Sequence, residues 1–489
     1  MSFGTAVTAA LAAYVAVLAF VGLRARAART SGSLADFYLA GRRLGPVVLA
    51  FTLYATQYSG NTLVGYPGEA YRMGFSWVMS VGFMLAVVVV YLVIAPRLRA
   101  ASVRHRFVTP ADWLDARFGS PALTRVTNLL MAAAIVNYLL AQLMAMGHVV
   151  AGLSDGFIPY AAGVLVLAAA ILGYELLGGL RAVAWTDCLQ GGLLAIGLFG
   201  LLTATFLSGD GLAAAADWVL ENEPAKGFRP PGPVLATWAS TILLIGFSGA
   251  VYPQAIQRVF AARSGRSLRQ ALAFMSFMPF LTTLPVFMVG ILALPRLAGF
   301  EGIAADQVLP SLLRDWAGES PWMFAMCLVT VVGVIAAIMS TADSVLLTLS
   351  SMLAKDLAGP FLRWRAAGAA VAESRITGIG KIASLAIMGV LAAVALTPRI
   401  SLWGLLELKM ELLVQAAPVF VLGLTWSGLR ARPALAGVIA GTLLAAGLTL
   451  AGYHRIAGLH AGLLGAMLNA LVAAAGSLAF WPRVRAAGK

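Results

Sequence analysis

Uninterrupted apolar runs of about twenty residues recur along the whole sequence, and they constrain the fold more than any other feature. Hydrophobic residues make up 61% of the 489 residues and charged residues only 11%, against about 45–50% and about 25% in soluble domains. A water-soluble fold cannot bury that much apolar surface. Membrane β-barrels alternate polar and apolar residues instead of forming long apolar runs. The sequence therefore predicts an all-α polytopic membrane protein.

A helix needs about 20 mostly apolar residues to cross a bilayer. By this measure we expect thirteen spans, at 5–23, 46–66, 74–96, 122–152, 157–178, 182–207, 233–256, 269–295, 321–354, 376–397, 402–427, 433–451 and 459–481. With the N-terminus outside and the C-terminus cytoplasmic, 26 of the 34 Lys and Arg residues fall on the cytoplasmic side, as the positive-inside rule requires. Each Lys and Arg is then assigned to one side or the other, none is left inside the membrane, and Lys409 falls at an exposed outer helix end.

Two spans are interrupted in the middle by polar and small residues. The second span contains 55–62, which reads Ala-Thr-Gln-Tyr-Ser-Gly-Asn-Thr, and the seventh contains 246–249, followed by Pro253. Small residues can merely allow close helix packing, but two breaks five spans apart indicate inverted repeats whose broken helices bind ion and substrate. We expect four parts: 1–45, an extra helix and cytoplasmic loop; 46–207, the first repeat; 233–427, the second repeat; and 433–489, two helices and a short cytoplasmic tail.

The ninth span carries a face of hydroxyl groups. Ala337, Ser340, Thr341 and Ser344 fall on one side of a helix because three, four and seven residues separate them, and Asp343 stands beside that side. Hydroxyl, carboxylate and carbonyl oxygens are hard ligands, which suit Na⁺ better than a transition metal. The alternative is that the hydroxyls bond to carbonyls of their own helix.

Three acids lie in or beside spans, where a charge costs at least about 2.5–3.5 kcal/mol. They are Asp343, Asp187 and Glu175. Asp187 lies one turn inside the cytoplasmic end of the sixth span, where it serves either in cation release or in an ion pair with Arg181. We expect Glu175, near the same end, to be structural.

With these features the sequence resembles the sodium:solute symporter family over nearly its whole length. The segments that carry the resemblance are Asp36–Arg42, Ser59–Gly60, Gly65–Gly68, Gly178–Val183, Trp185–Asp187, Pro253–Gln254, Gln257–Arg258 and Ser340–Ser344. The resemblance implies a leucine-transporter-like core of ten helices in two inverted repeats.

The resemblance also implies a sodium site. It is formed by backbone carbonyls of the broken first core helix and by a carbonyl and two hydroxyls of the eighth, at positions Ala55, Tyr58, Ala337, Ser340 and Thr341. Some members of the family have a second cation site, which corresponds here to Asp187, Asp343 and Ser344. This chain departs from that pattern, because position 343 is Asp rather than a hydroxyl residue.

The substrate pocket of the family lies between the broken first core helix and the sixth. The candidate lining residues are Gln57, Ser59, Asn61, Thr62, Gln142, Phe247 and Ser248. Gln142 can alternatively serve a hydrogen bond between helices. Proline-carrying relatives have an Asp where this chain has Gln57, which disfavours proline. The fourth span lacks the Arg with which sialic acid carriers hold the substrate carboxylate.

We therefore predict a secondary active transporter, not an enzyme. It couples inward Na⁺ flow to uptake of a small organic solute: a monocarboxylate, a vitamin such as pantothenate, a neutral amino acid or a sugar. One rival is a proton-coupled carrier of the same fold that uses Asp343, and another is a transport-like membrane sensor. A further rival, an intramembrane enzyme, lacks a nucleophile–base pair, and a zinc protease or serine hydrolase has no support because neither H-E-x-x-H nor G-x-S-x-G occurs.

The expected partners follow from this prediction. They are Na⁺, the small-molecule substrate and the lipid bilayer, with no nucleic acid and no obligate protein partner. The expected location is the cytoplasmic membrane of a prokaryotic cell, which the chain crosses many times.

Overall fold

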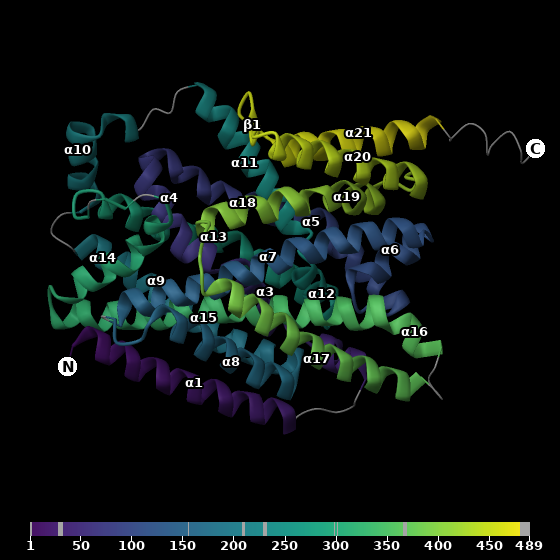
Figure 1. Cartoon of the computed structure of the whole chain (residues 1–489), viewed down its shortest axis with the longest axis horizontal. Helices are drawn as coiled ribbons and strands as arrows, with labels where there is room; N and C mark the ends of the chain where they lie inside the picture. The colour runs from purple at the N-terminus through teal and green to yellow at the C-terminus, as the bar shows by residue number, and fades with distance from the viewer. Residues whose placement is uncertain are drawn as a thin grey trace, which may run out of the picture.

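The protein is a bundle of long helices that run roughly side by side (Figure 1). The computed structural model describes residues 2–27, 33–154, 156–207, 211–227, 232–297, 299–300, 302–364 and 369–479. Within them, the short helices α10 and α14 lie at one end of the bundle, and α6 and α16 lie at the other (Figure 1). The predicted C-terminal cytoplasmic tail lies outside the described residues.

The first half of the chain forms α1 to α10 with four shorter helical segments between them. These are α1 (Phe3–Ala27), α2 (Leu34–Leu39), η1 (Ala40–Arg42), α3 (Pro46–Gln57), η2 (Asn61–Gly65), α4 (Tyr66–Met73), η3 (Gly74–Met79), α5 (Ser80–His105), α6 (Pro110–Phe118), α7 (Pro121–Leu153), α8 (Tyr160–Gly178), α9 (Leu180–Leu207), α10 (Leu212–Asn222) and η4 (Pro224–Lys226).

The second half contains the remaining helices and one short hairpin. These are α11 (Gly232–Ala250), α12 (Pro253–Ala261), α13 (Gly265–Ala293), η5 (Gly302–Gln307), α14 (Val308–Ala317), α15 (Pro321–Ser351), η6 (Met352–Ala358), α16 (Gly359–Trp364), α17 (Ala369–Ala395), α18 (Leu402–Leu413), η7 (Val414–Ala416), α19 (Ala417–Thr425), α20 (Ala431–Leu450), β1 (Arg455–Ile456), β2 (Leu459–His460) and α21 (Ala461–Ala479). The two strands pair antiparallel, with Arg455 opposite His460.

Ten helices in the described part of the chain are long and apolar enough to cross a membrane, or eleven if the bent pair Val234–Ala250 and Pro253–Ala261 counts as one span. The chain is therefore a multi-pass membrane protein. Two predicted spans, 46–66 and 402–427, are missing from that number because shorter helices divide them: α3 and η2 in the first, α18 and α19 in the second. The thirteen spans and the orientation of the termini stay predictions.

Both interrupted spans are broken in the structure. α3 ends at Gln57, and Tyr58 takes an extended conformation. α11 ends at Ala250, and the chain bends by 48° before α12. This second break comes just after the glycines expected to cause it, because the residue before Pro253 is pushed out of the helical region.

α15 lies among α9, α7 and α3 and is buried along most of its length. Small residues let its backbone approach α9. A Cβ on Gly333 would lie 2.7 Å from the Leu193 carbonyl oxygen, and one on Gly197 would lie 2.9 Å from the Cα of Thr330. Such close approach is how membrane helices gain packing energy without a hydrophobic driving force. It holds the hydroxyl face of α15 in a fixed position against the broken end of α3.

Candidate functional site

The hydroxyl face of α15 meets the end of α3. The hydroxyls of Ser340 and Thr341 each donate a hydrogen bond to the carbonyl oxygen of Ala55 at 3.0 Å. The Ser340 hydroxyl also lies 3.1 Å from the carbonyl oxygen of Ala337. All four residues are fully buried, and each hydroxyl can turn its hydrogen away and become an acceptor. The contact therefore gathers neutral oxygens of the kind that bind Na⁺.

Tyr58, the remaining residue of the predicted sodium site, marks the point where α3 stops. Its backbone is extended, with φ −97° and ψ 107°, which takes its carbonyl out of the regular helical ladder. The chain then resumes as η2, where the amide of Thr62 bonds to the Ser59 carbonyl at 2.9 Å. The five predicted residues thus lie at the α3 break and in the middle of α15.

The predicted second cation site is built around an arginine. The carboxylate of Asp187 lies 3.6 Å from the guanidinium of Arg258 and accepts a hydrogen bond from Thr52. The same guanidinium donates to the hydroxyl of Ser344 and, at 3.1 Å, to that of Thr52. The side chains of Asp187 and Arg258 are both fully buried. A protein cation therefore already faces Asp187 and Ser344.

Asp343 belongs to the same buried network. Its carboxylate accepts hydrogen bonds from the phenol of Tyr174 at 2.5 Å and from the hydroxyl of Ser344 at 3.2 Å. With Asp187 and Asp343 ionised and Arg258 charged, this group of three carries one net negative charge. That charge could be balanced by a proton or by a metal cation.

The expected alternative, an ion pair between Asp187 and Arg181, is replaced by two other pairs. Arg181 lies 2.6 Å from Asp36, and Asp187 faces Arg258. The expectation that no Lys or Arg is left inside the membrane also meets a difficulty. Arg258 is fully buried in α12, which lies within a span if the bent pair α11 and α12 counts as one. The sequence concealed this because Arg258 comes two residues after the end of the predicted span 233–256, whereas α12 continues to Ala261 beyond the 48° bend.

A small cavity lies beside the broken stretch of α3. Three of the predicted substrate residues, Gln57, Ser59 and Thr62, line it. Its volume is about 10 Å³, enough for about one water molecule, so a solute fits only after the surrounding helices move apart. The other residues around it are Tyr66, Met84, Val87, Tyr138, Ile245, Gly249, Tyr252, Leu406, Lys409 and Met410. We call this the inner cavity.

Two predicted substrate residues hold the broken stretch in place instead of lining the inner cavity. The side chain of Gln142 accepts from the amide of Gly60 at 2.8 Å and donates to Asn61 at 3.0 Å. Asn61 in turn donates to the carbonyl of Leu402 at 2.6 Å. These bonds tie η2 to α7 and to the start of α18, which matches the alternative interpretation of Gln142.

The last two predicted substrate residues lie elsewhere. Phe247 lines a separate apolar pocket with residues of α19 and α21, such as Val421 and Leu463. The Ser248 hydroxyl donates to the carbonyls of Leu244 and Met410, at 2.6 and 2.8 Å. α11 therefore turns Phe247 away from the inner cavity and uses Ser248 to contact α18.

Lys409 lines the inner cavity, although the sequence places it at an exposed helix end. Its side chain is 1% exposed, and its ammonium lies over the rings of Tyr138 and Tyr252. The spacing of α18 contained the signal. Lys409 follows Leu402, Leu405 and Leu406 by seven, four and three residues, which is the same face of a helix. The acids on either side of Lys409 in the sequence are instead typical of an exposed helix end.

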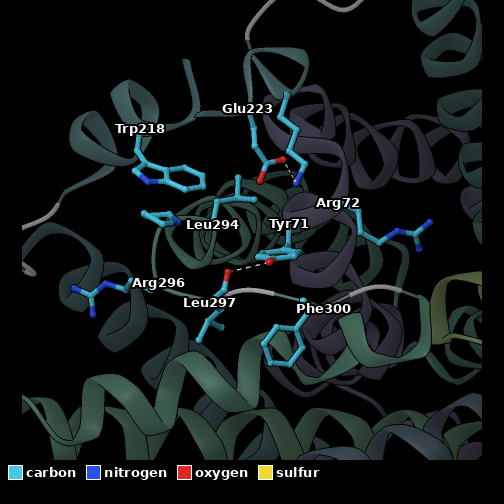
Figure 2. Close-up of a pocket in the computed structure, with 11 residues that line it drawn as sticks. Tyr71, Arg72, Trp218, Glu223, Leu294, Arg296, Leu297 and Phe300 are labelled. Atoms are coloured by element: carbon cyan, nitrogen blue, oxygen red, sulfur yellow. Dashed lines mark hydrogen bonds and ion pairs between the residues drawn. The ribbon is translucent and has the colours of Figure 1, made fainter. Parts of the chain in front are cut away.

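A wider cavity opens at the end of the bundle near α10 (Figure 2). Its volume is about 760 Å³. Tyr71 projects into it and donates to the Leu297 carbonyl at 2.9 Å. Its cations face acids of the same chain: Arg296 lies 2.7 Å from Glu319, and Lys226 lies 2.5 Å from Glu223. The inner cavity differs in this respect, as its lysine faces aromatic rings.

A family model described as the sodium:solute symporter family matches residues 37–441. The chain belongs to the sodium:solute symporter family. It is a transporter rather than an enzyme, and membership of this family supports sodium-coupled uptake of a small solute, with Na⁺ as the coupling ion. The resemblance stated from the sequence motifs is confirmed.

Two curated relatives illustrate the similarity. The sodium/proline symporter of Escherichia coli K12 is 27% identical over 464 residues, which cover 91% of this chain and 88% of the relative. The sodium/pantothenate symporter of the same organism is 27% identical over 451 residues, which cover 89% of this chain and 88% of the relative.

Solved structures give the same fold. A Na⁺-coupled sialic acid symporter in a substrate-bound outward-open state aligns with a TM-score of 0.78, at 18% identity, over 98% of this chain and 99% of that one. A nucleobase-cation-symport-1 family transporter with bound bromovinylhydantoin aligns with a TM-score of 0.55, at 15% identity, over 90% and 93%. At these identities the likeness concerns the fold alone.

Proposed function

We propose that this symporter binds Na⁺ between the carbonyls of Ala55, Tyr58 and Ala337 and the hydroxyls of Ser340 and Thr341. The observation that carries the proposal is the convergence of both α15 hydroxyls on the Ala55 carbonyl at 3.0 Å. These neutral oxygens belong to two separate helices, so the distances between them change when the helices move. Na⁺ affinity therefore depends on the conformation of the bundle.

We propose that the solute binds in the inner cavity, next to this ion. The stretch that provides the Ala55 and Tyr58 carbonyls also provides Gln57, Ser59 and Thr62 to the cavity wall. Na⁺ that ties this stretch to α15 therefore orders one wall of the cavity before the solute arrives. Coupling arises because ion and solute both bind the same conformation more tightly than the other.

The test is the Na⁺ dependence of uptake in proteoliposomes after Thr341→Ala, with Thr341→Ser as the matched control. Loss of one charge-assisted oxygen contact, worth about 1.5–3 kcal/mol, should raise the Na⁺ concentration for half-maximal uptake about 10- to 100-fold. Thr341→Ser keeps the hydroxyl and should behave almost like the wild type. An unchanged Na⁺ activation curve in Thr341→Ala would overturn the proposed site.

For Asp187, Asp343 and Ser344 we propose a charge network on the path of the ion, in which the Arg258 guanidinium occupies the place of a second metal cation. Two carboxyl groups beside a single guanidinium support one rival, a proton-coupled carrier in which Asp343 takes up the proton. A pH gradient that drives uptake without Na⁺, and fails to do so in Asp343→Asn, would favour that rival.

The wider organisation is part of the same proposal. We propose thirteen spans with the N-terminus outside, two inverted repeats at 46–207 and 233–427, and a location in the cytoplasmic membrane of a prokaryotic cell. The two breaks, at Tyr58 and at residues 251–252, support the repeats. The orientation can be tested by placing a cysteine near the N-terminus and treating intact cells with a membrane-impermeant thiol reagent. The reagent should label this cysteine, and a failure to label it would contradict the proposed orientation.

A further inference from the structure

Lys409 is a buried basic side chain in the wall of the inner cavity. It lies on α18, on the face formed by Leu402, Leu405 and Leu406, all of which are buried. Its side chain is 1% exposed. A lysine in such a position normally pairs with a carboxylate, because an isolated buried charge is strongly unfavourable.

In the described part of the chain, no carboxylate pairs with this ammonium. It lies 3.3 Å from the ring centroid of Tyr138 and 4.9 Å from that of Tyr252. The acids two residues to either side have other partners. Glu407 pairs with Arg455, and Glu411 contacts Thr449 and His460, at 3.3 and 3.8 Å.

The two aromatic rings compensate only partly for this burial. A cation–π contact returns a fraction of the free energy that an ammonium loses on leaving water. A carboxylate in the cavity would supply the counter-charge and accept a charge-assisted hydrogen bond. While no carboxylate is bound, the two electron-rich rings can hold the ammonium. A solute carboxylate can then replace them as its partner.

The other residues that line the inner cavity restrict the chemical class of solute that can bind there. Of the residues that line the inner cavity, Lys409 is the basic one, and the others are amide, hydroxyl, aromatic, thioether or aliphatic. A ligand with an ammonium group would find no carboxylate there and would be repelled by Lys409. A ligand with two carboxylates would find one cation.

We propose that Lys409 binds the carboxylate of the transported solute, and that this solute is a small monocarboxylate without an amino group. Gln57, Ser59 and Thr62, which come from the broken stretch of α3, then bond hydroxyl, carbonyl or amide groups of the solute body. The inference deepens the proposed function, because it names the substrate class of the same cavity.

The experiment measures the thermal stability of the detergent-purified protein in NaCl and in choline chloride, with matched pairs of probes. The pairs are lactate with lactamide and pantothenate with panthenol, and proline serves as the zwitterion. A ligand that binds only the folded state raises stability in proportion to RT ln(1 + [L]/Kd). The variants are Lys409→Met, which keeps the bulk, Lys409→Arg, which keeps the charge, and Arg455→Met, a control outside the cavity.

In NaCl, at least one carboxylate should stabilise the wild type, and its neutral analogue and proline should not. Lys409→Met should weaken the apparent affinity for that carboxylate about 10- to 100-fold while keeping the Na⁺ shift, which also shows that the variant is folded. Lys409→Arg should keep part of the response, and Arg455→Met should keep all of it.

Three results would overturn the proposal. They are a wild type that no carboxylate stabilises, a preference for proline or a neutral analogue, and an unchanged carboxylate response in a folded Lys409→Met. Failure of the proposed function looks different. It appears as a wild type without a Na⁺ shift, or as a carboxylate response that is lost in Lys409→Met but equal in NaCl and choline chloride.

Discussion

Arg258→Met should destabilise the protein strongly, because it removes the guanidinium that lies beside two buried acids, Asp187 and Asp343. The side chains of Arg258, Asp187 and Asp343 are fully buried, and the guanidinium lies 3.6 Å from Asp187. Removal of one partner of a buried ion pair costs about 3–5 kcal/mol, since the other charge stays in a medium of low polarity. Met keeps much of the apolar stem of arginine, so the loss reflects charge and hydrogen bonds.

The assay is a double-mutant cycle on thermal unfolding of the detergent-purified protein. Asp187→Asn removes the charge that Arg258→Met leaves unpaired, so the double variant should melt above Arg258→Met alone. Arg455→Met is the matched control. Its guanidinium pairs with Glu407 at an exposed site, where a pair contributes about 0–1 kcal/mol, and its melting temperature should hardly change.

The cycle also tests the role of the network. If Arg258 occupies the place of a second cation, Na⁺ should raise the melting temperature of Arg258→Met more than that of the wild type. The reasoning is refuted if Arg258→Met is as stable as the wild type, or if the effects of the two substitutions simply add.

Three further predictions concern other parts of the structure. Gly60→Ala should lower stability and Na⁺ affinity, because its Cβ would lie 2.6 Å from that of Ala145 and overpacking costs about 1–3 kcal/mol; a wild-type Na⁺ activation curve would contradict this. Burial raises the pKa of Asp306, which lies outside the spans, to about 7, against the opposing hydrogen bond from the Leu402 amide. The folded state then holds the proton more tightly than the unfolded chain, so this group's contribution to stability falls as pH rises from about 4 to about 7. Asp306→Asn should flatten the melting temperature over that interval, and an unchanged pH profile would count against it. Phe247→Ala should leave the solute concentration for half-maximal uptake unchanged, because Phe247 lines a separate pocket; a large increase would place it on the solute path.

The sequence predicts those features of the site that depend on residues within a single helix. The hydroxyl face of Ala337, Ser340 and Thr341 follows from helical spacing alone, and the structure has it turned towards α3. The break at Tyr58 follows from a run of polar and small residues that cannot stay helical in lipid unless something else satisfies the backbone. Neither inference needs a partner to be known.

Side-chain direction was harder to predict in helices that are apolar on every side. Phe247 and Ser248 lie in the interrupted stretch 246–249, where the pattern expects a substrate site, yet one faces an apolar pocket and the other bonds to α18. In a soluble helix the polar face identifies the outside. In a membrane helix the lipid-facing and core-facing sides have similar composition, so the pattern does not distinguish them.

By itself the sequence determined the membrane class, the family, the two breaks and the hydroxyl face, because each depends on composition or on spacing within one segment. Only the tertiary structure decided which charges meet. Arg258 reaches Asp187 and Ser344 from another helix, and Lys409 turns into the inner cavity although acids flank it in the chain. The physical reason is that the free energy of a buried charge depends on the groups around it in space, and in this fold those groups come from segments far apart in the sequence.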